Sequence, residues 1–283
     1  MKHSLFFVLT CLICLQPLFS QEPSTEFDKK FRFGLRVTPQ VCWYTSGDKN
    51  NVSAGTSMGF GFGLNMERRL SPTVTFLTGI GGDFEGGKYT VRNDAANNYV
   101  VKYWMDQSNE FVVPKAGKIS DPNATVYVLK ERLIKTTHIT IPLLMKLSTQ
   151  EYSGLKYFGM FGAEVGFRVR STADDSYSEV RKYTSDTDFK ITSTDSKQTD
   201  LNLSSESSSF PMRFGLNAGL GFEYRMAGST SFLFSINYFR SFTNVMQNES
   251  DVAYYGVTSD NKYLFVKQNL KQTAIRLTIG IMF

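Results

Sequence analysis

The chain ends on residues 273–283, TAIRLTIGIMF, in which two kinds of side chain alternate strictly. One face consists of Thr273, Ile275, Leu277, Ile279, Ile281 and Phe283, and the other of Ala274, Arg276, Thr278, Gly280 and Met282. A repeat of two residues is typical of a β-strand, because successive side chains point to opposite faces. The segment therefore predicts a strand with one apolar and one mostly polar face.

Seven further segments show the same alternation. They lie around residues 31–37, 60–66, 74–80, 139–147, 155–169, 210–224 and 232–238. With their flanking residues, the strands are expected to reach the about 10 residues that a tilted strand needs to cross a bilayer. The sequence therefore predicts an all-β fold, an eight-stranded antiparallel transmembrane β-barrel.

The connections between these segments alternate in length. Short ones lie near residues 70–73, 149–154 and 227–229, and long ones near 45–56, 86–123, 171–209 and 244–269. Short periplasmic turns and long extracellular loops are the pattern of outer-membrane barrels. Within the connection 86–123, residues 89–91 and 99–104 look like strands, as does the segment 125–129 that follows it, which predicts a barrel wall extending above the membrane. The Ser/Thr/Asp-rich segment 171–209 is expected to be a solvated, mobile loop.

The average composition excludes a bundle of transmembrane helices. The 283 residues are 41% hydrophobic and the mean hydropathy is −0.22, whereas such a bundle needs several apolar runs of about 20 residues. The formal net charge of +5 is too small to indicate a nucleic-acid partner.

The N-terminus has the features of a secretory signal. Lys2 precedes an apolar stretch from Leu5 to Phe19, which is too short to span a bilayer. We expect a signal peptide over 1–20, a short periplasmic tail over 21–30 and the barrel over 31–283; an uncleaved N-terminal anchor is the alternative. Only Cys42 lies outside the signal, so no internal disulfide is expected.

Alternation alone does not say which face points outward, and a soluble lipocalin-type barrel would be apolar inside. Three features favour the membrane: glycines crowd the polar face, the final strand ends on Phe283, and mid-strand charges of both signs recur on the polar face. These charges are Arg36, Glu67, Lys146, Glu164, Arg213, Glu223 and Arg276.

Eight strands enclose an interior just wide enough for side chains to fill. Because buried ions need partners, the seven charges are expected to form a structural network that plugs the lumen. Ile279, Ile281 and Phe283 are expected to form the C-terminal signal that the barrel-assembly machinery recognises.

No catalytic, cofactor-binding or metal-binding residues are predicted. His138 is the one histidine after the signal, and neither a Gly-x-Ser-x-Gly elbow nor an adjacent acid accompanies it. We interpret it as a rim histidine, and the protein as not an enzyme. A calcium site among Asp174, Asp175, Asp186 and Asp188 is left open, without the spacing of a calcium loop.

Several stretches resemble PorT-like outer-membrane β-barrel proteins. They are residues 33–39 (FGLRVTP) with Trp43, 59–63 (GFGFG) with Glu67, 139–146 (ITIPLLMK), the glycines of 215–221 with Glu223 and Tyr224, and 277–283. The resemblance implies an eight-stranded barrel in the outer membrane of Gram-negative bacteria. The family's namesake takes part in type IX secretion and gliding; the long 171–209 segment departs from the family pattern.

These observations predict a structural or interaction protein: a membrane anchor, or a subunit of an envelope complex, with a link to secretion. Its expected partners are outer-membrane lipid, the assembly machinery during biogenesis and an envelope or secretion complex. Two alternatives stay open, a small-solute pore and an outer-membrane lipid-modifying enzyme.

Overall fold

The computed structural model describes residues 30–47, 49–108, 110–112, 125–185, 188–203, 209–246, 249–258 and 262–283. The predicted signal peptide and almost all of the predicted tail lie outside these ranges. Within them, no helix is long and apolar enough to cross a membrane.

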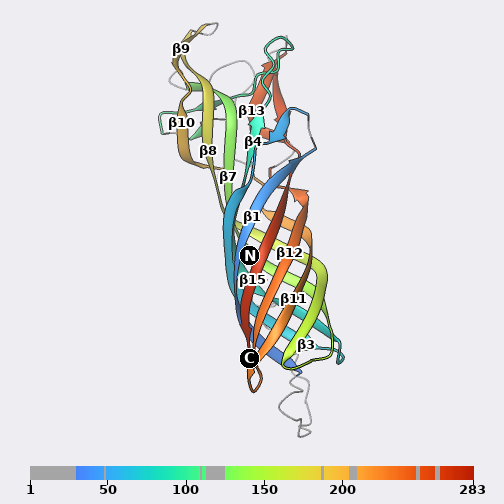
Figure 1. Cartoon of the computed structure of the whole chain (residues 1–283). Helices are drawn as coiled ribbons and strands as arrows, with labels where there is room; N and C mark the ends of the chain where they lie inside the picture. Colours follow the sequence, from blue (N-terminus) through green and yellow to red (C-terminus); the bar gives the residue numbers. More distant parts are fainter. Residues whose placement is uncertain are drawn as a thin grey trace, which may run out of the picture.

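Eight antiparallel strands close into a ring (Figure 1). In ring order they are β1 (Phe31–Ser46), β3 (Ser57–Arg69), β4 (Val74–Val91), β7 (Thr125–Ser148), β8 (Leu155–Ser185), β11 (Met212–Ala227), β12 (Thr230–Asn244) and β15 (Leu270–Met282). The last strand pairs with the first, from Gly34 opposite Met282 to Ser46 opposite Leu270. The eight-stranded antiparallel barrel predicted from the alternation is confirmed.

The apolar face of each strand points outward. Phe62 of β3 is 52% exposed, whereas Glu67 on the opposite face is 2% exposed. On β15, Ile275 is exposed and its neighbour Arg276 is buried. A soluble barrel would bury the apolar face instead, so that alternative is wrong.

Short turns join the strands at the lower end of Figure 1, which also holds the C-terminus. In the β3–β4 turn, Ser71 Oγ accepts a hydrogen bond from the Val74 N–H at 3.0 Å. The other two turns use residues with positive φ, Gly154 (φ 79°) and Gly228 (φ 55°), which glycine adopts without steric cost. These are the short connections predicted at 70–73, 149–154 and 227–229.

At the opposite end, β4, β7 and β8 continue beyond the ring and form a β-structured extension (Figure 1). Shorter strands complete it: β2 (Asn51–Ser53), β5 (Lys102–Met105), β6 (Phe111–Val112), β9 (Asp188–Thr194), β10 (Lys197–Asn202), β13 (Glu249–Val257) and β14 (Tyr263–Lys267). The predicted extension of the wall at 89–91 and 125–129 is confirmed.

The expectation of a mobile loop over 171–209 is wrong for the described residues 171–185 and 188–203, which form strands. β8 runs on to Ser185, pairs with β7 along its length, and then pairs with β9 and β10. The segment has a polar composition, but Ala173, Tyr177 and Leu201 are buried. Its few apolar side chains meet a hydrophobic surface supplied by other long connections, and this burial orders the segment.

This hydrophobic surface is a second core outside the ring, which we call the outer core. Its largest buried members include Tyr44, Tyr89, Tyr103, Leu129, Ile134 and Tyr177. Tyr103 stacks on Tyr127 with ring centroids 5.9 Å apart and meets Tyr177 edge-on at 5.7 Å. Packed aromatic rings of this kind favour a single arrangement of the strands above the barrel.

Glycine on the inner face makes room for large polar side chains. A Cβ on Gly81 would lie 2.7 Å from the guanidinium Nη2 of Arg36, and one on Gly87 would lie 2.6 Å from the ring of Tyr44. At Gly81 the Cβ would also lie 2.9 Å from the backbone carbonyl oxygen of Phe62, so glycine leaves room there for both the backbone of β3 and the Arg36 side chain.

Candidate functional site

Two clusters of charged side chains lie inside the ring. The upper cluster consists of Glu85, Glu164, Arg213 and Arg276. Arg276 donates to Glu164 Oε2 and to Glu85 Oε1, both at 2.7 Å. Arg213 donates to Glu164 Oε1 at 2.8 Å and also to Glu85. Each arginine thus bridges both carboxylates, and no side chain in the cluster is more than 4% exposed.

Polar and aromatic neighbours hold the upper cluster in place. Arg276 Nε donates to Gln40 Oε1 at 2.8 Å, and Asn217 Nδ2 donates to Glu164 Oε2 at 3.2 Å. The guanidinium carbon of Arg276 lies 4.3 Å from the centroid of the Phe239 ring, and that of Arg213 lies 4.5 Å from it. Cation–π contact offsets part of the repulsion between the two arginines.

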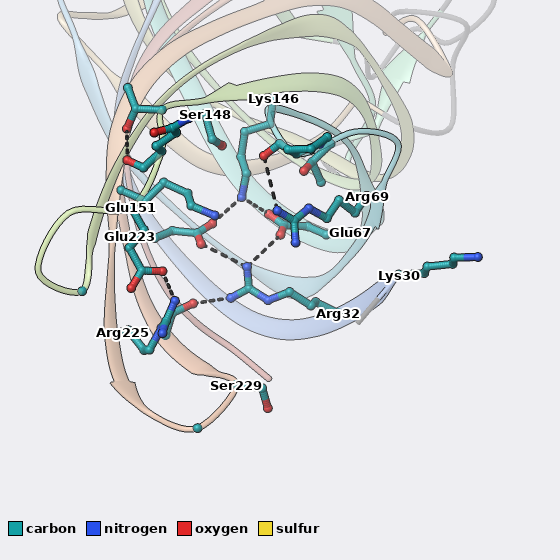
Figure 2. Close-up of a pocket in the computed structure, with 18 residues that line it drawn as sticks. Lys30, Arg32, Glu67, Arg69, Lys146, Ser148, Glu151, Glu223, Arg225 and Ser229 are labelled. Carbon is teal, nitrogen blue, oxygen red and sulfur yellow. Dashed lines mark hydrogen bonds and ion pairs between the residues drawn. The ribbon is translucent and has the colours of Figure 1, made fainter. Parts of the chain in front are cut away.

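The lower cluster lies nearer the short turns and consists of Arg32, Glu67, Lys146 and Glu223 (Figure 2). The ammonium of Lys146 donates to both Glu67 and Glu223. Arg32 Nη1 lies 3.0 Å from Glu223 and 3.4 Å from Glu67. The Lys146 Nζ also lies 5.0 Å from the centre of the Phe158 ring.

Each cluster joins four strands from different sides of the ring. The upper cluster links β4, β8, β11 and β15, and the lower one links β1, β3, β7 and β11. Each holds two carboxylates and two cations, so each is formally neutral. Such an arrangement ties opposite walls together and puts polar side chains across the lumen at two levels.

The remaining predicted charge, Arg36, belongs to neither cluster. Asp83 of β4 is attracted first by Arg276 and then by Arg36, and its carboxylate accepts a 2.7 Å hydrogen bond from Thr140 Oγ1. The structure therefore brings Glu67, Lys146 and Glu223 together in one cluster and Glu164, Arg213 and Arg276 together in the other, and places Arg36 beside Asp83.

The sequence analysis missed Arg32, Asp83 and Glu85. The predicted third strand stopped at Ile80, but alternation continued through Phe84 would have put Asp83 and Glu85 on the inner face. Arg32 lies on the polar face of the predicted first strand, near its end, outside the mid-strand charges that define the predicted network.

The predicted assembly residues lie on the outer face of β15. Phe283 is 49% exposed and Ile281 is 40% exposed. The Phe283 N–H donates to the Phe33 carbonyl at 2.7 Å, which anchors the last residue to β1. Ile279 pairs with Val37 on one side and Phe234 on the other.

His138 is buried inside the wall, with its Nδ1 3.4 Å from Glu85 Oε2. Its position beside an acid of the upper cluster makes it part of the lumenal packing, and among the described residues its Nδ1 has no hydrogen-bond partner. Across the described ranges, no three metal-ligating side chains come together.

The two described candidate calcium ligands are ion-paired. Asp174 pairs with Lys135 at 2.5 Å, and Asp175 receives Arg132 through two bonds of 2.7 and 2.6 Å. The other two candidates, Asp186 and Asp188, have side chains outside the part of the chain that the structure describes. Tyr103 donates its hydroxyl to Asp175 Oδ2 at 2.6 Å, and burial, together with the charge of Asp175, raises the pKa of Tyr103 well above its usual range.

A cavity of about 330 Å³ opens between the lower cluster and the short turns. We call it the vestibule; Figure 2 shows Arg32, Glu67, Lys146 and Glu223 pointing toward one another at its inner end. Its other charged lining residues are Lys30, Arg69, Glu151, Lys156 and Arg225. Arg225 pairs with Glu151. The sequence signal for this site is the set of basic residues beside the short turns.

Solved structures that are similar to this chain include outer-membrane and surface proteins of bacteria. Neisserial surface protein A is 12% identical, with 90% of this chain and 96% of that chain covered and a TM-score of 0.35. OprG from Pseudomonas aeruginosa is 10% identical, with 92% and 99% covered and a TM-score of 0.38. Ail, the attachment invasion locus protein of Yersinia pestis, is 9% identical, with 90% and 100% covered and a TM-score of 0.29.

No curated protein sequence matches the chain. The family model described as "Outer membrane protein beta-barrel domain" matches residues 19–247, most of the chain. The closed ring, the outward apolar face and the alternation of turn lengths agree with that match. The chain therefore belongs to the outer membrane protein beta-barrel domain family and is located in the outer membrane of Gram-negative bacteria.

Proposed function

We propose that this protein is a non-conducting outer-membrane scaffold that serves as a subunit or anchor of an envelope complex. The observation that carries the proposal is the upper cluster, in which Arg213 and Arg276 each bridge Glu85 and Glu164 across the lumen. A path for solutes would have to displace side chains that are held by charge-assisted bonds in a desolvated interior.

The extension above the ring supports an interaction role. Its outer core gives the extracellular part a packed interior of its own. A folded surface held by a rigid barrel suits recognition better than a mobile loop does, because less conformational entropy is lost on binding. The resemblance to PorT-like proteins extends the proposal to a complex linked to protein secretion.

The test is single-channel conductance in planar bilayers. We expect no stepwise conductance from the wild-type protein. Glu67→Ala is expected to give at most small steps, because Lys146 keeps Glu223 and the upper cluster stays intact. Stable, large steps from the wild-type protein would reject the proposal in favour of a pore.

The enzyme alternative has its own test. Lipid A from isogenic strains with and without the protein is compared by mass spectrometry. We expect identical profiles, since His138 is held beside Glu85 in the lumenal packing. A change in acylation that His138→Ala removes would show a lipid-modifying activity instead.

A further inference from the structure

Four neighbouring strands of the ring, β11, β12, β15 and β1, share an outward face that is almost free of charge (Figure 1). Alternation along these strands puts aliphatic, aromatic and small polar side chains on this face. Two charged side chains also alternate onto it, Arg240 of β12 and Lys271 of β15, and both are basic. Both lie at the end of their strand that is opposite the short turns.

The register of the sheet brings these two bases together. Arg240 lies opposite Thr273 of β15, and Lys271 is two residues further along that strand. Residues in such a diagonal relation are about 7–8 Å apart, within reach of long side chains. On the other side of β15, Thr273 lies opposite Trp43 of β1 and Lys271 lies opposite Thr45. We call Arg240 and Lys271 the rim pair.

The rim pair has no protein counterion in the part of the chain that the structure describes. Arg240 is exposed, Lys271 is half-buried, and neither forms an ion pair with a described residue. The outward faces of the four strands hold no carboxylate. By contrast, Lys135 on the outward face of β7 pairs with Asp174. Two cations that lie close together without an acid repel each other, so a bound anion would stabilise them.

The surface below the rim pair is apolar and faces lipid. Tyr238 of β12 and Ile275 of β15 lie opposite each other there, and both are exposed. Phe242, which is also exposed, lies beyond Arg240 on the side of the extension. Aromatic rings gather at the level of the lipid headgroups, and bases near that level reach toward them. The anions within reach of the rim pair are therefore those of the membrane lipid.

The position along the barrel decides which leaflet supplies that lipid. The long connections of an outer-membrane barrel are extracellular, and the rim pair lies at their end of the strands, so it faces the outer leaflet. In Gram-negative bacteria this leaflet consists of a glycolipid whose sugar headgroup carries phosphate. Its phosphate fits the two bases, and its acyl chains fit the apolar surface of Tyr238 and Ile275.

We propose that the rim pair binds the phosphate of one molecule of the outer-leaflet glycolipid, whose acyl chains lie along β12 and β15. Basic clusters beside a membrane-spanning segment recognise lipid phosphates in this way. The inference goes beyond the proposed function and does not depend on it, because the site lies on the outer wall of the barrel and not in the lumen.

Binding is measured on the full protein in detergent micelles by native mass spectrometry, which separates the barrel from its complexes with one or two lipids. The probe is purified lipid A with its phosphates, and the matched control is the same lipid A after the phosphates are removed. We expect the first molecule of phosphorylated lipid A to bind at least tenfold more tightly than the control, because only phosphate forms charge-assisted bonds with the two bases.

Variants place the lipid at the rim pair. Arg240→Gln and Lys271→Gln should each weaken binding of the first lipid about tenfold, the loss of one charge-assisted bond. Arg240→Lys keeps the charge and should bind within about threefold of the wild type. Arg68→Gln is the matched control, since Arg68 is an exposed base beside Phe31 at the other end of the ring, and it should leave binding unchanged. Gel migration with and without heating checks that all four variants are folded.

Three results would overturn the assignment: equal binding of the two forms of lipid A, unchanged binding in both glutamine variants, or an equal loss in Arg68→Gln. The last would show that any exposed base attracts the lipid. Phosphatidylglycerol is titrated in parallel; if it binds through Arg240 more tightly than lipid A does, the rim pair is a phospholipid site instead. A conducting barrel that binds lipid A at the rim pair rejects the proposed function alone.

Discussion

Arg276 of β15 donates from Nη1 to Glu164 Oε2 of β8 at 2.7 Å, although 112 residues and two strands separate the two residues. Both side chains are almost completely buried, at 2% and 0% exposure. An isolated ion in such surroundings costs several kcal/mol, so each residue requires the other.

The first prediction follows from this pair. Arg276→Met and Glu164→Gln should each destabilise the barrel by about 3–5 kcal/mol, since each leaves unpaired charge in the upper cluster. The double variant should cost clearly less than the sum of the two. Urea unfolding in lipid vesicles gives the three free energies. The exposed pair Lys130–Asp195 is the control, and its double-mutant cycle should be close to additive.

The second prediction concerns the lipid-facing surface. Phe62→Arg and Phe214→Arg should destabilise the barrel by about 2–4 kcal/mol, because a charge near the bilayer midplane is poorly solvated. Met58, which is 79% exposed at the start of β3, is the control at the rim. Met58→Arg should cost only about 0–1 kcal/mol. Equal stability of all three variants would contradict the placement of the membrane.

The third prediction concerns assembly. Deleting Phe283 removes the hydrogen bond to Phe33 and the exposed aromatic side chain that follows β15. We expect less protein in the outer membrane and more periplasmic degradation. Phe283→Tyr keeps the ring and should assemble normally. Gel migration with and without heating reports the folded fraction, and a normal folded level in the deletion variant would show that Phe283 is not a signal.

The fourth prediction separates the extension from the ring. Asp175→Asn should destabilise the outer core by about 3–5 kcal/mol, because it strands the buried Arg132. The adjacent Asp174 pairs with the exposed Lys135, so Asp174→Asn should cost about 1 kcal/mol or less. Limited proteolysis should cut the extension of the first variant and leave its barrel intact. Cleavage of both variants at equal rates would contradict this difference.

The fifth prediction concerns pH. Burial holds the pKa of Tyr103 well above its usual range in the folded protein, whereas in the unfolded chain a tyrosine titrates near about 10. Its contribution to stability is therefore complete below about pH 10 and falls as the pH rises further, because the unfolded state loses its proton first. The unfolding midpoint should drop between pH 9 and 11, and less so in Tyr103→Phe. An equal drop in both proteins would mean that other groups cause it.

The sequence by itself determined the class of the molecule. Alternation in residues 273–283 and in seven other segments predicted the strands, and the charges on the inner face predicted which face avoids lipid. These features are local: a strand's side chains alternate whatever its neighbours are. The short turns were equally readable, since they need only a few residues such as Gly154 and Gly228.

Only the tertiary structure decided which charges meet. Alternation assigns Glu67 and Glu164 to the same face. It does not show that Glu67 binds Lys146 and that Glu164 binds Arg276. The height of a side chain inside a barrel depends on the tilt and stagger of every strand between it and its partner. The tertiary structure also determines that the described part of the segment 171–209 is ordered. Tyr177 and Leu201 become buried only when β4, β5 and β7 supply the other walls of the outer core. A polar segment is ordered or mobile according to the apolar surface it meets, and that surface comes from distant parts of the chain.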